Sequence, residues 1–292
     1  MKIMVTGANG FTAQHLCITL VNKGFEVHAL GRGPQRIAVH NQLIYHHIEL
    51  TNVRSVLELF ELVSPDVVIH TAAMSKPDEC DLNRDACLKN NVEVTRYLLK
   101  ASRYFPVHFI HLSTDFIFGE NGPHCEDDQP APLNFYGESK LMSEKLVQES
   151  EIIHTIVRPV FIYGPVWEGM RPSFIHWVKN KLETNESIKV VTDQLRTPTY
   201  VYDLCKGIEQ ILMFKKQGVY HLAGKDILSP YDMAVTVAKL LGYDAKLIIP
   251  VTSAEFPEPV CRAKRSGLRI EKAIAELDYA PHSFEEALRL SL

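Results

Sequence analysis

The chain has 292 residues, of which 46% are hydrophobic and 23% are charged. This composition can bury a large core, and it excludes disordered, collagen-like and coiled-coil proteins. The 31 Lys and Arg residues face 35 Asp and Glu residues, a formal net charge of −4, so non-specific binding of nucleic acid is disfavoured. No stretch of about 18 apolar residues occurs, so we expect no membrane span, and we do not expect the MKIMVTGANG start to be a signal peptide.

The six cysteines form no Cys-x-x-Cys pair and do not lie at zinc-ligand spacing with histidine. We therefore expect reduced thiols, a cytoplasmic location and no metal site. His46 and His47 are neighbours in an expected strand, where they point to opposite faces and cannot readily share a metal ion. His111 lies in an apolar strand, and we expect a core residue with its hydrogen bonds satisfied.

Short apolar runs alternate with helical patterns through the first half of the chain. Runs that are apolar throughout predict buried strands, and Gly24 follows the first helical pattern as a glycine just past a helix end. The predicted strands are Lys2–Thr6, Glu26–Leu30, Leu43–Ile48, Asp66–Thr71, His108–Ser113 and Ile152–Val157, and the predicted helices are Phe11–Lys23, Val53–Val63 and Arg84–Tyr104. This alternation predicts an α/β fold of the Rossmann type with a doubly wound parallel sheet.

The alternation weakens after the strand that ends at Val157, and the remaining chain is richer in Pro and aromatic residues. Further helices are predicted near Ser173–Thr184, Tyr202–Phe214, Pro230–Leu241 and Ile270–Ala275. We interpret residues 1–160 as a dinucleotide-binding domain and residues 161–292 as mainly a smaller, mixed α/β substrate-binding domain. The helix near 202–214 is expected to interleave the two by packing back on the first, and no long linker separates them.

A glycine-rich loop joins the first strand to the first helix. Thr6–Ala13 reads TGANGFTA, with the spacing G-x-x-G-x-x-A. Gly7 permits a tight turn and Gly10 lets the backbone approach a pyrophosphate. The residues expected to meet that anion are Gly7, Asn9, Gly10, Phe11 and Thr12, the last two at the helix N-terminus. A glycine turn that only caps a helix is the alternative, but the position in the first βαβ unit favours a dinucleotide.

The second strand is followed by Arg32, where a cofactor with a free ribose 2′-OH would usually meet Asp or Glu. The charge and fork of an arginine suit a 2′-phosphate, so NADP(H) is favoured over NAD(H); a solvated surface arginine is the alternative. Two further pairs end the third and fourth strands and are expected to line the cofactor site: Glu49-Leu50, toward the adenine, and Ala72-Ala73, at the sheet edge. Tight packing would explain these pairs equally well.

Tyr136 and Lys140 form a Y-x-x-x-K motif, and Asn134 is the expected N-cap of their helix. Positions i and i+4 share one helix face, so the phenol and the ammonium lie together. The ammonium is expected to lower the pKa of Tyr136 and to suit it for acid–base catalysis. Thr114 ends the strand His108–Ser113 at the same sheet edge, where its hydroxyl can orient a carbonyl; a simple strand cap is the alternative.

Together these motifs carry a family resemblance. TGANGFTA, LSTDFIFG, PLNFYGESK, LRTPTYVYDL and a late R-x-x-x-S-G-L-x-x-x-K resemble the extended short-chain dehydrogenase/reductase family, more narrowly its dTDP-4-dehydrorhamnose reductases, over essentially the whole chain. The resemblance implies that Thr114, Tyr136 and Lys140 are the catalytic trio and that Tyr136 and Lys140 also bind the nicotinamide cofactor, Lys140 through the ribose hydroxyls. It implies reduction of a nucleotide-diphosphate 4-keto-6-deoxysugar by NAD(P)H, with Tyr136 as general acid.

The resemblance also implies substrate contacts from Asp115, Arg196 and Arg262, although surface or interdomain roles remain open for the two arginines. Two departures matter. The late Arg-Pro of the reductases reads Arg262-Ala263, which puts the substrate grip there in doubt. The Asp-Glu pair of the related 4,6-dehydratases reads Asp115-Phe116, and because Phe cannot transfer a proton, sugar dehydration is disfavoured.

Other functions stay open beside the reductase. The same scaffold supports nucleotide-sugar epimerases and other ketone reductases, and an epimerase retains its cofactor tightly. An alternative of another class is a non-catalytic NADP-binding regulatory subunit, because the methionine adenosyltransferase β subunit also resembles these reductases. We expect a nucleotide-sugar substrate and no nucleic-acid or membrane partner; the oligomeric state is left open, with a homodimer as one candidate.

Overall fold

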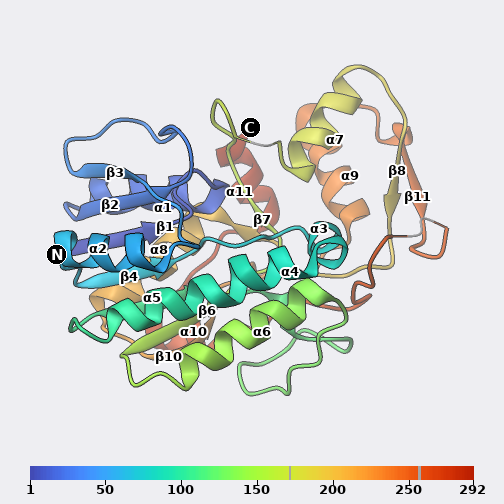
Figure 1. Cartoon of the computed structure of the whole chain (residues 1–292). Coiled ribbons are helices and arrows are strands. Elements are labelled where there is room, and N and C mark those ends of the chain that lie inside the picture. The colour runs from blue at the N-terminus through green and yellow to red at the C-terminus, as the bar shows by residue number, and fades with distance from the viewer. Residues whose placement is uncertain (171, 256–257) are drawn as a thin grey trace.

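The computed structural model describes residues 1–170, 172–255 and 258–292. In these residues a seven-stranded sheet has the strand order β10-β6-β5-β4-β1-β2-β3 (Figure 1). Its strands are β1 (Lys2–Thr6), β2 (Glu26–Gly31), β3 (Leu43–His47), β4 (Val67–His70), β5 (His108–Leu112), β6 (His154–Arg158) and β10 (Gly218–His221). Every neighbouring pair is parallel. The expected Rossmann-type, doubly wound parallel sheet is confirmed.

Helices cover both faces of this sheet because its central strands are apolar and buried. The helices are α1 (Phe11–Asn22), α2 (Val53–Val63), α3 (Pro77–Leu82), α4 (Arg84–Cys87), α5 (Val94–Ser102), α6 (Phe135–Gln148), α7 (Phe174–Glu183), α8 (Val201–Met213), α9 (Pro230–Leu241), α10 (Glu271–Leu277) and α11 (Phe284–Ser291). On one face α1 packs against α8, and on the other α5 packs between α2 and α6. The strand order changes direction beside β1, the point where sheets of this kind bind ligands.

The single long helix predicted over Arg84–Tyr104 is three segments. After α4 the backbone forms a π-helical stretch, η1 (Leu88–Glu93), before α5 continues to Ser102. Inside this stretch Asn91 is buried, and its side-chain amide donates to the carbonyl of Met74 at 3.1 Å and to the hydroxyl of Ser139 at 2.9 Å. Its carbonyl oxygen accepts from the Met74 backbone N–H. The wide turn therefore ties this helix to α6 and to the segment after β4.

The second half of the chain both completes the central sheet and builds a separate layer. Strand β10, beyond residue 160, pairs with β6 and was not predicted. The remaining strands are β7 (Ile162–Tyr163), β8 (Ile188–Val191), β9 (Thr199–Tyr200) and β11 (Ile248–Val251), which pair as β7 with β9 and β8 with β11. Helices α7 and α9 pack against each other beside β8 and β11 (Figure 1). Among the described residues, no helix has the length and apolarity needed to cross a membrane.

Candidate active site

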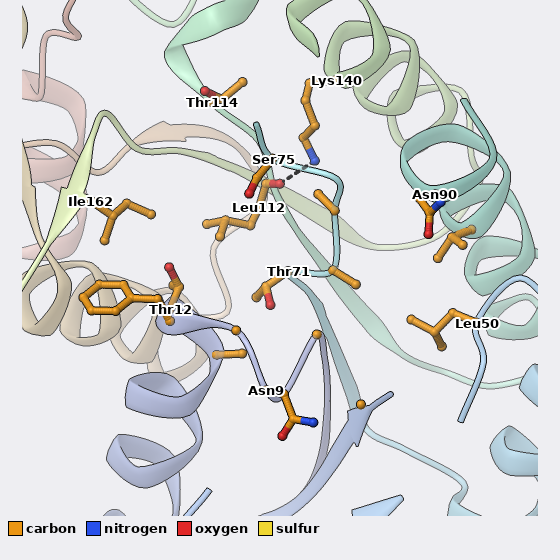
Figure 2. Close-up of a pocket in the computed structure, with 18 of the residues that line it drawn as sticks. Asn9, Thr12, Leu50, Thr71, Ser75, Asn90, Leu112, Thr114, Lys140 and Ile162 are labelled. Atoms are coloured by element: carbon orange, nitrogen blue, oxygen red, sulfur yellow. Dashed lines mark hydrogen bonds between the residues drawn. The ribbon is translucent and has the colours of Figure 1, made fainter. Parts of the chain in front are cut away.

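A cleft of about 680 Å³ opens at the carboxyl ends of the central strands. Its walls contain residues predicted from the sequence to bind cofactor or to catalyse: Gly7, Asn9, Gly10, Phe11, Thr12, Arg32, Glu49, Leu50, Ala72, Ala73, Thr114, Tyr136 and Lys140. Figure 2 shows Asn9 and Thr12 on one side of this space, with Lys140 and Thr114 on the opposite side. The fold thus brings the glycine loop and the Y-x-x-x-K helix to one continuous cavity.

The glycine loop is shaped to receive an anion. Gly7 has a φ of +70°, and a Cβ there would lie 2.9 Å from the Cα of Ala72. The N–H of Gly10 donates to the carbonyl of Gly7 at 2.7 Å, and Gly10 is the N-cap of α1. No side chain among the described residues caps α1. The N–H groups of its first turn are therefore available to a phosphate, as the diphosphate of a dinucleotide requires.

Asn9 fastens the loop after β2 to the glycine loop. Its amide nitrogen donates to the carbonyls of Arg32 at 2.8 Å and Pro34 at 3.0 Å, while its oxygen accepts from the N–H of Arg36 at 3.0 Å. The side chains of Arg32 and Arg36 are exposed and line the same end of the cleft. Arg36 was not among the residues predicted to line the site, although a second arginine four residues after Arg32 was a usable signal.

The Y-x-x-x-K motif sits in the first turns of α6. Asn134 is confirmed as N-cap, since its side-chain oxygen accepts from the N–H of Gly137 at 3.0 Å. Tyr136 and Thr114 line the same cleft, where the Thr114 side chain opposes the rise in the pKa of Tyr136. The ammonium of Lys140 donates to the carbonyl of Leu112 at 2.8 Å (Figure 2). The three side chains of the expected trio therefore meet where β5 ends.

Burial controls the protonation of this trio. It raises the pKa of Tyr136 above its ordinary value, and the Thr114 side chain only partly opposes this. The prediction of a lowered pKa was therefore wrong for the protein without cofactor, because burial and the nearby Asp115 carboxylate both disfavour the phenolate. Burial also lowers the pKa of Lys140 to about 8. At neutral pH Tyr136 is a phenol that can donate a proton, and Lys140 is an ammonium.

The three residues predicted to contact substrate line a small hollow that adjoins the cleft, with Asp115 and Phe116 common to both. Asp115 is buried, which raises the pKa of its carboxyl group, while the nearby Arg196 guanidinium opposes that rise. Arg196 donates to the side chain of Gln194 at 2.6 Å and lies over the Phe161 ring.

Arg262 is held by two carboxylates. It lies 3.0 Å from Asp78 in α3 and 2.8 Å from Glu258. The first contact ties the C-terminal segment to a helix of the first half of the chain, so Arg262 makes an ion pair between the two halves at the edge of the hollow. An ion pair of this kind was one of the alternatives that the sequence left open for Arg262.

Several other cleft residues were not predicted. Ser75, Asn90, Phe161 and Ile162 all line the cavity, and Figure 2 shows Ser75, Asn90 and Ile162 around it. Phe161 has a φ of +36°, a strained conformation of the kind that collects at functional sites. None of these residues belongs to a motif with its own chemistry, so only the folded loops reveal them.

A doubly wound sheet with a glycine loop and a buried Tyr-Lys pair in one cleft is the arrangement of a nicotinamide-dependent oxidoreductase of the short-chain type. The comparisons with known proteins agree. The chain matches the RmlD substrate binding domain family over residues 1–292. It is 31% identical over 291 residues to the spore coat polysaccharide biosynthesis protein SpsK of Bacillus subtilis, covering 99% of this chain and 95% of that protein.

Other relatives extend the comparison. The methionine adenosyltransferase 2 subunit beta of Pongo abelii is 29% identical, over 90% of this chain and 78% of that protein. The structure of dTDP-4-dehydrorhamnose reductase from Bacillus anthracis in complex with NADP has a TM-score of 0.87 at 25% identity, with 99% and 98% of the two chains covered. A UDP-glucuronic acid 4-epimerase from Bacillus cereus, solved with NAD, has a TM-score of 0.87 at 26% identity, with 100% and 98% covered.

The chain therefore belongs to the RmlD substrate binding domain family, within the extended short-chain dehydrogenases/reductases. By class it is an NAD(P)-dependent oxidoreductase.

Proposed function

We propose that this enzyme reduces a nucleotide-diphosphate-linked 4-keto-6-deoxysugar with NADPH and that Tyr136 is the general acid. The observation that carries the proposal is the single cleft with an anion-binding loop at one end and Thr114, Tyr136 and Lys140 at the other. The names of the dTDP-4-dehydrorhamnose reductases among its structural neighbours support the substrate class.

A nicotinamide cofactor held by the glycine loop and Lys140 would supply the hydride for the keto carbon. The protein provides the remaining chemistry through its own side chains. The hydroxyl of Thr114 orients the keto oxygen, and the buried phenol of Tyr136 donates a proton to that oxygen. The ammonium of Lys140 binds the ribose and stabilises the negative charge that remains on Tyr136 until a solvent proton returns.

The two arginines after β2 support a preference for NADPH. Arg32 and Arg36 line the cleft on the side of β2, and in the described residues no acidic side chain immediately follows that strand where a ribose 2′-OH would meet one. Glu49 and Leu50, after β3, would then meet the adenine, and Ala72 and Ala73 would pack along the cofactor. The related structures are consistent with either cofactor, since they contain NADP or NAD.

The hollow beside the catalytic trio is the proposed sugar-nucleotide site. Asp115, Arg196 and Arg262 border it, and residues 161–292 supply four of its nine lining residues. Arg196 is half-buried and already lies over Phe161, so its charge can meet a diphosphate without a large rearrangement. We further propose that residues 1–160 mainly bind the cofactor and residues 161–292 mainly bind the substrate.

Two other functions have a specific observation in their favour. The structural likeness to UDP-glucuronic acid 4-epimerase favours an epimerase that keeps its cofactor through the cycle. The 29% identity to a methionine adenosyltransferase β subunit favours a binding module whose trio is not used for turnover.

The deciding experiment measures the cofactor content of the purified protein and then the oxidation of added NADPH with a panel of nucleotide 4-keto-sugars. Stoichiometric oxidation of NADPH with one sugar supports the reductase. A tightly retained NAD with interconversion of two sugars, and no net oxidation, supports the epimerase. Tight NADPH binding without turnover, together with binding to a purified methionine adenosyltransferase catalytic subunit, supports the regulatory module.

A further inference from the structure

His111 lies on β5 directly behind the cleft, and its side chain is fully buried. The expected core position is thus confirmed, but the expectation of satisfied hydrogen bonds was wrong, because Nδ1 has no hydrogen-bond partner among the described residues. Its other ring nitrogen, Nε2, lies 3.3 Å from the ammonium of Lys140. The neighbouring strand positions Phe109 and Ile110 are apolar. Burying an imidazole with one unpartnered nitrogen costs free energy. In the part of the chain that the structure describes, the contact of the other nitrogen with Lys140 is therefore the one polar interaction of this ring that needs a role.

The donors of Lys140 define this role. An ammonium has three N–H groups and no lone pair, so every contact it makes must be to an acceptor. One N–H donates to the carbonyl of Leu112 at 2.8 Å, and a second faces His111 Nε2. Since Nε2 accepts, the proton of the neutral ring lies on Nδ1. Two consecutive residues of β5 thus take two donors of Lys140, and the third remains for the cleft.

We propose that His111 is a positioning residue that fixes the Lys140 ammonium at the cleft wall by accepting its hydrogen bond, leaving one N–H for the nicotinamide ribose. The ribose contact rests on the proposed function. The bond between His111 and Lys140 is present without any cofactor, and it can be tested separately.

Two groups at this place titrate near the assay range, Lys140 and the Cys87 thiol, whose pKa is lowered by its hydrogen bond with Cys80. His70 on β4 uses both ring nitrogens on threonine hydroxyls, so it is not a second acceptor. Burial lowers the pKa of both His70 and His111 well below the assay range, so both rings are neutral there. Glu144 on α6 and Cys87 on α4 raise the pKa of Lys140, while burial lowers it to about 8. An acceptor on the ammonium favours its charged form, and removing that acceptor lowers the pKa further.

The first test is made on the wild-type protein without cofactor. Nitrogen-15 NMR of labelled histidine reports which ring nitrogen carries the proton, and the His111→Gln spectrum assigns the resonances of His111. We expect a neutral ring that is protonated on Nδ1. A ring protonated on Nε2 would overturn the proposal, because that nitrogen could not accept from an ammonium.

The second test titrates Lys140 directly. The carbon-13 shift of Cε in lysine-labelled protein reports its protonation, with Lys140→Met as the assignment control. We expect His111→Leu to lower the proton affinity of Lys140 about tenfold. His111→Gln, whose side-chain oxygen reaches a similar position, should stay within about twofold of wild type. An unchanged Lys140 titration in folded His111→Leu would show that the histidine only fills space.

A matched control and an activity measurement complete the design. His108 is on the same strand but on the opposite face, where its Nε2 meets the Thr155 hydroxyl at 2.8 Å, so His108→Leu should leave the Lys140 titration unchanged. With a working substrate, His111→Leu should also move the alkaline fall in kcat to lower pH, and His111→Gln should restore it. If no substrate is turned over, the proposed function fails while both NMR tests still decide the role of His111.

Discussion

The side-chain amide of Asn9 donates a 2.8 Å hydrogen bond to the backbone carbonyl of Arg32. A residue of the glycine loop therefore sets the position of the residue expected to recognise the cofactor phosphate. The carbonyl of Pro34 and the N–H of Arg36 bind the same amide group, so the whole turn moves as one unit with the glycine loop. Substitutions at Asn9 and Arg32 are consequently coupled in their effect on the cofactor.

The proposed contact between Arg32 and the 2′-phosphate predicts a loss of affinity for NADPH and not for NADH. Arg32→Ala should weaken NADPH binding about 10- to 100-fold, the value of one or two charge-assisted hydrogen bonds, and leave NADH binding nearly unchanged. Fluorescence titration with both cofactors measures this. Arg54→Ala, on the exposed face of α2, is the control for loss of a surface cation. Equal losses for NADPH and NADH would contradict a role of Arg32 at the 2′-phosphate.

The phenol of Tyr136 is predicted to be needed for turnover only. Tyr136→Phe keeps the ring that packs in the cluster with Phe135 and the two buried cysteines, so the fold and NADPH binding should persist. Loss of the acid should reduce kcat by at least about 10² to 10⁴. Steady-state assay beside a cofactor titration separates the two effects. A variant with normal kcat would show that another group protonates the keto oxygen.

The pH dependence follows from the two shifted pKa values. Burial lowers the pKa of Lys140 to about 8, so its ammonium is present below that pH and is lost as the pH rises through it. Burial raises the pKa of Tyr136, so the phenol stays protonated over the same range. We therefore expect kcat to fall above pH 8 with a single ionisation, measured in buffers of constant ionic strength. A flat profile to pH 10 would contradict the requirement for charged Lys140.

A buried ion pair on the helix of Lys140 predicts a large effect on stability. Arg158 on β6 makes a two-pronged contact with Glu144 on α6, at 3.0 and 2.7 Å, and both side chains are buried. Glu144→Gln would leave the guanidinium buried without its counter-charge, at a cost of about 3–5 kcal/mol in the free energy of unfolding. Urea denaturation measures it. Glu58→Gln, in the exposed pair with Arg54, should cost at most about 0.5 kcal/mol.

Much of the fold could be predicted because its signals are local. The strand Lys2–Thr6 and the helix Val53–Val63 match their predicted bounds, since each is an apolar pattern limited by turn or capping residues. Strand β10 was missed because its four residues, Gly-Val-Tyr-His, form neither an apolar run nor an alternating pattern long enough to predict a strand. The cleft residues that belong to known motifs were predicted. The strained backbone of Phe161 and the raised pKa of Tyr136 were not, because both arise only in the assembled chain.

The strand β10 has a consequence for the making of this protein. It pairs with β6 at the edge of the central sheet, yet it follows β6 by some sixty residues that include α7, β8 and α8. A ribosome must therefore release about three quarters of the chain before this sheet is complete, and until then β6 is an unpaired edge exposed to other chains. The two halves are thus joined in folding as well as in the site, and neither is a module that evolution or an engineer can exchange by cutting at one point.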